Sequence, residues 1–179
     1  MKIHVIYPVI SVLFFSCSHY IDSNISKNQN SIKTGLEVHK RYNVFKYNAN
    51  YTFTRDSEVF HPRAFEIRLP KKMKYYTGIN GTDFGFYYNN NQVIFVKIGV
   101  NNSLVNNDIM YEPSFRDLEG FIDDTLLTQR GKFDIKEIKP DPKNKNNLIK
   151  KGKATILLYN ISKRDIDCFV SFANTFHFR

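Results

Sequence analysis

The chain has 179 residues, of which 42% are hydrophobic, and it carries a formal net charge of +9 at neutral pH. This length and apolar content are sufficient for one domain with a hydrophobic core, which excludes a chain that is disordered throughout. The basic residues are spread along the chain and accompany no recognisable nucleic-acid-binding module, so we expect no nucleic-acid partner.

Residues 1–16 have the features of a secretory signal peptide. Lys2 supplies a basic start, an apolar run extends from Val5 to Phe15, and Ser16 is a small residue at the boundary with a polar stretch. The apolar run is too short for a membrane-spanning helix, which needs about 20 apolar residues. We therefore expect residues 1–16 to be a signal that is removed.

The end of this segment, Phe14-Phe15-Ser16-Cys17, resembles the lipobox of bacterial lipoprotein precursors, although a leucine and a small residue are usual where Phe14 and Phe15 stand. The resemblance implies that Cys17 is acylated, with a fatty acid such as palmitate, and becomes the first residue of the mature protein. Residues 17–35 are then the lipidated cysteine and a flexible tether, because the stretch after Cys17 is polar and lacks sustained periodicity. An ordinary secretory signal and a buried first element with a core cysteine remain the alternatives.

With Cys17 acylated, we expect a bacterial cell-envelope protein whose N-terminal lipid holds it at a membrane. The outer membrane is favoured over the inner membrane if the cell has both. Buried acyl chains contribute about 0.8 kcal/mol per methylene group, so more than one chain gives stable anchoring. Cys168 is then the only other cysteine, and no intramolecular disulfide can form.

Residues 36–179 are predicted to form a single globular domain rich in strands. Within 42–55 the odd positions from Phe45 to Phe53 are apolar and the even ones mostly polar, which predicts one long strand or a pair bent around Asn48–Asn50. The segment 65–69 alternates likewise and ends at Pro70. Asn80-Gly81 predicts a hairpin turn, and the apolar segment 92–100 predicts a central strand.

One main helix is predicted at about 114–129. Ser114 is a suitable N-cap, with Asp117 three residues later, and Gly131 is a natural end. One helical face would be apolar, through Phe115, Leu118, Ile122 and Leu126.

After this helix we expect strands at 133–138 and 154–161, with a Lys/Asn/Pro-rich loop at 139–150 between them. The residues from Ile166 to the end alternate with a period of two, which predicts a final strand with Cys168 on its apolar face. The fold class predicted is therefore α+β, an antiparallel sheet of about six to eight strands with the helix packed on it. The segment 65–70 and the aromatic hairpin after it also resemble the α/β sandwich of PsbP-type proteins, a resemblance of pattern that implies no activity.

The candidate chemical groups do not form a recognisable catalytic or metal-binding motif. Cys168 is predicted to be a buried structural residue, because a nucleophilic cysteine needs a lowered pKa and a partner base. The adjacent Asp123 and Asp124 would point about 100° apart on a helix, which favours a solvated face over acid–base work. The five histidines lack ligand spacing, so we expect no metal and no cofactor; they are His4, His19, His39, His61 and His177.

The aromatic surplus has two interpretations. Strand residues such as Tyr75, Tyr76, Tyr87 and Tyr88 could line a ligand groove, or they could form cross-strand aromatic pairs, which we favour. No catalytic or ligand-binding residue can be assigned on either interpretation.

We therefore expect a membrane-anchored binding or assembly module, with an envelope protein as its partner. The sequence does not determine the oligomeric state. The alternatives are a hydrolase-like enzyme with dispersed site residues and a surface-exposed host-interaction factor. Convergence of His61, His177 or carboxylates in a cleft would favour the enzyme, whereas a flat or aromatic-lined surface would favour binding.

Overall fold

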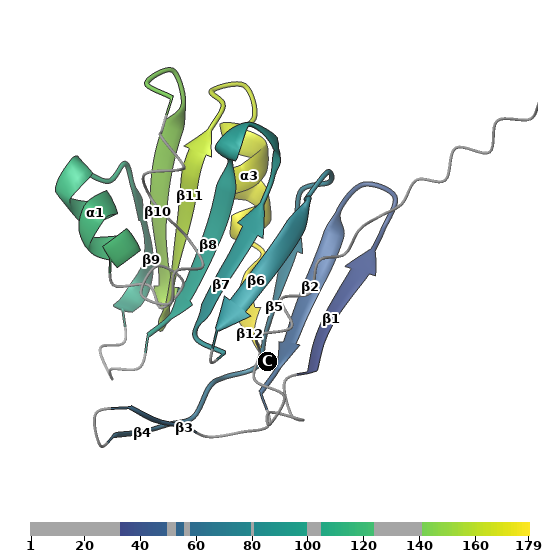
Figure 1. Ribbon diagram of the computed structural model, residues 1–179, viewed down its shortest axis with the longest axis vertical. Helices are drawn as coiled ribbons and strands as arrows, with labels where there is room; N and C mark the ends of the chain where they lie inside the picture. The colour runs from purple at the N-terminus through teal and green to yellow at the C-terminus, as the bar shows by residue number, and fades with distance from the viewer. Residues whose placement is uncertain (1–32, 50–52, 56–57, 80, 100–104, 124–140) are drawn as a thin grey trace, which may run out of the picture.

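A computed structural model describes residues 33–49, 53–55, 58–79, 81–99, 105–123 and 141–179 of the chain. In these residues ten strands form two antiparallel sheets, of four and six strands, and a separate ribbon pairs β3 (Phe53–Arg55) with β4 (Glu58–Phe60) (Figure 1). Two α-helices, α1 (Phe115–Asp123) and α3 (Ile166–Ala173), accompany them. The domain is thus mixed but dominated by strands, and the predictions of one sheet, of six to eight strands and of one main helix are too simple.

The four-stranded sheet has the order β1-β2-β5-β12. Its strands are β1 (Lys33–Val38), β2 (Asn43–Asn48), β5 (Phe65–Leu69) and β12 (His177–Phe178). β1 begins ahead of the expected domain start at position 36. The predicted alternation is confirmed in β5 and in β2 from Phe45 on, although Val44 on the opposite face is buried as well. One long strand over 42–55 is wrong, because β2 ends at Asn48 and β3 pairs in a separate ribbon. The fully buried side chains of the inner face are Phe45, Tyr47, Phe65, Ile67 and Leu69.

The six-stranded sheet has the order β6-β7-β8-β11-β10-β9. Its strands are β6 (Tyr75–Ile79), β7 (Asp83–Tyr87), β8 (Val93–Ile98), β11 (Ala154–Ile161), β10 (Lys145–Gly152) and β9 (Val105–Tyr111). β8 has partners on both sides, so the central strand predicted there is confirmed, as is the strand at 154–161.

Two loop predictions have different outcomes. The β6–β7 turn is confirmed: Gly81 has a φ of 66° and the Thr82 N–H donates to the carbonyl of Ile79 at 3.1 Å. The loop predicted at 139–150 is wrong in its second half, because β10 starts at Lys145 and buries Leu148 and Ile149 between two neighbouring strands. The strand predicted at 133–138 lies outside the described residues.

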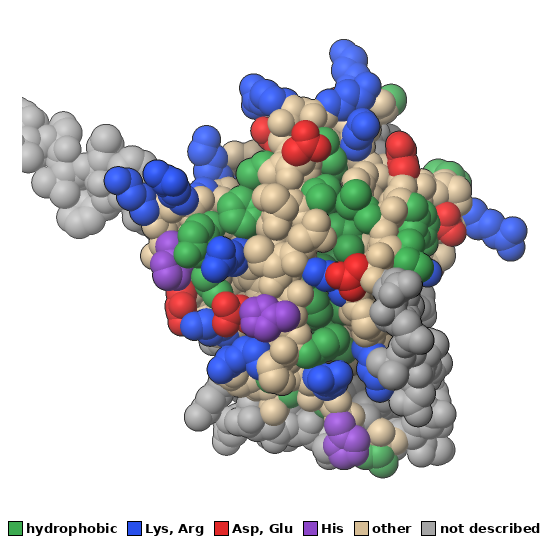
Figure 2. Space-filling view, turned by 180° about the vertical axis from the view of Figure 1, so that it is seen from behind, with side chains coloured by type: hydrophobic (Ala, Val, Ile, Leu, Met, Phe, Trp, Pro, Cys, Tyr) green, Lys and Arg blue, Asp and Glu red, His purple; other side chains and the backbone are tan. Residues whose placement is uncertain are grey.

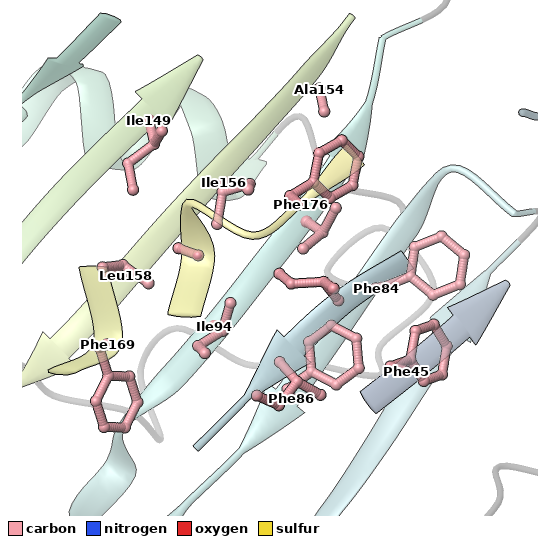
Figure 3. Packing of buried hydrophobic residues seen from close by; sticks show 14 of the residues in the cluster. Phe45, Phe84, Phe86, Ile94, Ile149, Ala154, Ile156, Leu158, Phe169 and Phe176 are labelled. Carbon is pink, nitrogen blue, oxygen red and sulfur yellow. The ribbon is translucent and has the colours of Figure 1, made fainter. Parts of the chain in front are cut away.

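The core lies between the two sheets and is rich in rings (Figure 3). Phe45 of the four-stranded sheet meets Phe84 and Phe86 of β7 edge-on, with ring centroids 5.7 and 4.9 Å apart. Edge-to-face pairs of this kind contribute about 0.5–1.5 kcal/mol beyond the area that they bury. The aromatic surplus of the sequence is therefore largely core.

The C-terminal segment is the clearest error of the sequence analysis, because residues 166–173 form helix α3 and not a strand. Ile166, Phe169 and Ala173 are buried at helical spacing and pack in the same core as the two sheets. A Ser162–Asp165 hydrogen bond of 2.7 Å forms the turn that starts the helix. Only His177–Phe178 continues as a strand, β12.

Helix α1 packs on the other face of the six-stranded sheet, through Ile122 with Leu118 and Phe121 beside it. Its predicted cap is confirmed: the Ser114 hydroxyl donates to the Asp117 carboxylate at 2.7 Å, and the Asp117 N–H donates to that hydroxyl at 3.2 Å. Phe115 was expected on the buried face but is 77% exposed. The remainder of the predicted helix, with Leu126 and Gly131, lies outside the described residues.

Candidate functional site

The residues expected to carry chemistry do not come together. Cys17, His4, His19 and Asp124 lie outside the described residues, whereas His61 and His177 are both exposed. Over the described part of the chain, no three His, Cys, Asp or Glu side chains are grouped so that they could hold a metal ion. None of the helices there is long and apolar enough to cross a membrane.

Cys168 was predicted to be buried, but it is an exposed free thiol on α3. The prediction failed because it placed this residue on a strand face, and the helix turns it away from Ile166 and Phe169. Partial burial of the sulfur raises its pKa, and the negative charge of Asp165 raises it further. Both effects disfavour the thiolate, so Cys168 lacks the activation of a catalytic cysteine.

The tyrosines considered for a ligand groove form aromatic pairs, which is the interpretation favoured from the sequence. Tyr75 stacks on Tyr87 with centroids 4.5 Å apart, and Tyr76 packs against Phe86 at 6.2 Å. Tyr88 is buried, which raises its pKa, and its hydroxyl lies 3.4 Å from the carbonyl oxygen of Pro70. These rings stabilise the sheet and do not line a groove.

The most organised exposed surface is the outer face of the four-stranded sheet, which carries acidic, basic and histidine side chains (Figure 2). Register places Lys46, Glu66 and His177 in one row across β2, β5 and β12. The Lys46 ammonium donates to the Glu37 carboxylate at 2.6 Å, and this hydrogen bond holds the pKa of Glu37 below its ordinary value. The His39 Nε2 lies 3.7 Å from the same carboxylate.

An aromatic and cationic cluster adjoins this row where β2 and β5 meet α3. The Arg68 guanidinium lies 5.1 Å from the centroid of the Tyr42 ring, which stacks on His39 at 4.9 Å. Phe172 of α3 lies 6.4 Å from the Tyr42 ring. The Arg68 backbone N–H donates to the Thr175 hydroxyl at 2.8 Å, which holds strand and helix together. Such a surface can bind a polar or acidic partner through charge and ring contacts.

Asn160 is a structural residue that the sequence analysis missed. It has a φ of 57° and is buried, and its side-chain oxygen accepts the backbone N–H of Asp141 at 2.8 Å and the amide of Asn144 at 3.1 Å. Its amide group donates to the carbonyl of Asn91 at 3.3 Å. Asn160 therefore connects two loops at one end of the six-stranded sheet. The only signal for this role in the sequence is the residue type, because asparagine tolerates a positive φ better than most residues.

The chain matches no protein-family model, no curated protein and no solved structure.

Proposed function

We propose that this chain is a lipid-anchored protein of the bacterial envelope whose domain is a binding or assembly module. The anchor is supported by Phe14-Phe15-Ser16-Cys17, with an apolar segment before it and a polar one after it. The outer membrane is the favoured location if the cell has two membranes.

The observation that carries the binding role is the outer face of the four-stranded sheet. Its exposed groups are held in defined positions by Lys46–Glu37 and by Arg68–Tyr42, and the two central strands, β2 and β5, have fully buried inner faces. A rigid scaffold with an ordered polar surface suits recognition of a partner protein. An enzyme would require a nucleophile or base beside an activating group, and Cys168 and His177 are exposed on different elements, α3 and β12.

The anchor is tested by metabolic labelling with a fatty-acid probe, comparing the wild-type chain with Cys17→Ala. We expect label in the wild type and none in the variant. Equal labelling of both chains, or of neither, would exclude acylation at Cys17 and the location that depends on it.

The binding role is tested by placing a photo-crosslinking amino acid at His177, in the row on the outer face, in cells that make the full chain. The matched control carries the same amino acid at Glu119, an exposed position on α1. We expect one discrete crosslinked product from position 177 and none from position 119. The same products from both positions, or none from either, would contradict a partner on this face.

A further inference from the structure

Two loops at one end of the four-stranded sheet carry a concentrated group of basic side chains. The β1–β2 hairpin supplies Lys40 and Arg41, and the segment between β5 and β6 supplies Lys71, Lys72 and Lys74. We call these five residues the basic rim. All are exposed except Lys71, which is half-buried, and no acidic residue occurs at positions 38–42 or 70–74.

The two loops form one continuous surface. Asn43 pairs with Val38 of β1 on one side and with Leu69 of β5 on the other, so both loops leave the sheet at the same end. The Lys71 ammonium connects them, because it donates to the carbonyl of His39 at 2.7 Å and to the side-chain oxygen of Asn43 at 3.3 Å. The positive charges are therefore brought together by the fold as well as by the sequence.

The six-stranded sheet presents its own basic loops at this end. The Lys74 N–H donates to the carbonyl of Tyr87 at 2.8 Å, which brings the rim to the end of β7. Antiparallel register places the start of β10 and the end of β11 at the same end, with four more basic residues; these are Lys143, Lys145, Lys163 and Arg164. Figure 2 shows Lys and Arg side chains projecting along the upper edge of the molecule. Asp141 and Asp165 offset part of this charge.

Large apolar side chains are exposed at the same end. Val38 closes β1 and is 61% exposed, and Tyr75 opens β6 and is 37% exposed. Both side chains lie beside the basic rim, because β1 ends and β6 begins at this end of the sheets. Basic side chains interspersed with exposed apolar ones are typical of surfaces that lie on anionic membranes, where the charges meet phosphates and the apolar groups enter the headgroup boundary.

We infer that this end of the domain docks on an anionic phospholipid surface, with the basic rim against the headgroup phosphates. The choice of a membrane over a nucleic acid rests on the proposed acylation of Cys17, which would hold the domain beside a bilayer. The apolar groups agree with that choice. An aliphatic side chain such as Val38 suits a lipid boundary, whereas single-stranded nucleic acids are bound through rings on which bases stack.

The test uses the full-length chain with Cys17→Ala, so that no acyl group contributes to binding. It is mixed with vesicles of phosphatidylcholine alone, or of equal parts phosphatidylcholine and phosphatidylglycerol, and bound protein is measured by flotation. The rim variant adds Lys40→Glu, Lys72→Glu and Lys74→Glu. The matched control adds Arg63→Glu, Lys153→Glu and Arg179→Glu at the other end of the sheets, with the same change in net charge.

We expect the parent chain to prefer the anionic vesicles and the rim variant to lose at least about 100-fold in partitioning onto them. The control should change by no more than a few-fold. Residues 1–16 are identical in all three chains, so any membrane affinity of that segment cancels in the comparison. Circular dichroism should show the same fold for all three chains. The urea midpoint of the control should fall slightly, because Arg63 lies over the Phe178 ring and Arg179 donates to Asn48.

Two further measurements keep the inference testable if the rim variant is unstable. Binding of the parent chain to anionic vesicles should fall steeply with added salt, and Val38→Ser should weaken it with the fold unchanged. Equal losses in the rim and control variants, no preference for anionic vesicles, or binding of a single-stranded oligonucleotide without vesicle binding would each overturn the inference. Loss of labelling at Cys17 with vesicle binding retained would contradict the proposed anchor and leave the docking surface in place.

Discussion

The two faces of the four-stranded sheet differ sharply although they are made by alternate residues of the same strands. Phe65 is fully buried among rings, whereas its neighbour Glu66 faces outward beside Lys46 and His177. The inner face therefore carries stability, and the outer face carries groups whose replacement costs little. Substitutions one residue apart in the sequence should therefore differ sharply in their effect on the free energy of unfolding.

The largest expected effect comes from Phe65→Ala on the inner face. The ring contacts four others with centroids 5.0–5.8 Å away; these belong to Phe45, Tyr47, Phe84 and Phe176. Its removal should lower the free energy of unfolding by about 3–5 kcal/mol in urea denaturation. The control, Glu66→Ala, should change it by no more than about 0.5 kcal/mol. Similar losses for the two variants would contradict the difference between the faces.

Asn160→Ala tests whether a buried polar group is as important as a buried ring. The substitution removes the acceptor for the Asp141 N–H and the Asn144 amide, and we expect a loss of about 1–3 kcal/mol in urea denaturation. Asn160→Gly, which accepts the positive φ, separates the backbone contribution from the hydrogen bonds. If glycine restored full stability, the hydrogen bonds would be unimportant.

On the outer face, Tyr42 and Arg68 should be coupled only weakly. A double-mutant cycle with Tyr42→Ala and Arg68→Ala should give a coupling energy of about 0.5–1 kcal/mol, because the guanidinium is exposed above the ring. Thermal denaturation of the four chains provides the measurement. A coupling of several kcal/mol would mean that this face is structural.

Cys168→Ser should have a smaller effect still, no more than about 0.5 kcal/mol, since the thiol is exposed. The thiol of the folded protein should react with a thiol reagent, and the rate should keep rising at pH values above the ordinary thiol pKa because the pKa of Cys168 is raised. A thiol that reacts only after unfolding would indicate that the residue is buried.

The smallest expected effect is the pH dependence of the α1 cap. The Ser114 hydroxyl and backbone N–H donate to Asp117 and lower its pKa below the ordinary value of 3.8. The cap therefore stabilises the folded state above pH 3.8, and this contribution is lost as the pH falls through the lowered pKa. The difference in urea midpoint between wild type and Asp117→Asn should shrink as the pH falls, and a constant difference would exclude this titration.

The strands of this domain were predictable where burial alternates strictly, as in 65–69, and the α1 cap was predictable because Ser114 and Asp117 act locally. Helix α3 was not, because Ile166, Cys168, Val170 and Phe172 also satisfy a period of two. The true burial of Ile166, Phe169 and Ala173 depends on a core that the rest of the chain supplies.

The candidate surfaces also combine features that the local sequence predicts with contacts that only the fold creates. The residues of the outer face were visible only as polar positions in strands, and their pairing depends on register across three strands. Lys71, Lys72 and Lys74 are neighbours in the sequence, whereas their proximity to Lys40 and Arg41 follows from strand pairing between distant segments. Local spacing cannot predict such contacts.

The direction of β1 bears on the membrane anchor proposed for this chain. The strand enters the sheet at Lys33 and reaches the basic rim only at Val38, about 20 Å further on. Lys33 lies sixteen positions after Cys17, and that length of chain spans at most about 55 Å, so an acyl anchor and the rim could reach the same bilayer. Docking would then be an intramolecular event at an effective concentration in the millimolar range, at which even a weak affinity keeps the rim on the lipid. Shortening the tether until the rim can no longer reach the bilayer would therefore lift the domain from the membrane, even with the contact residues unchanged.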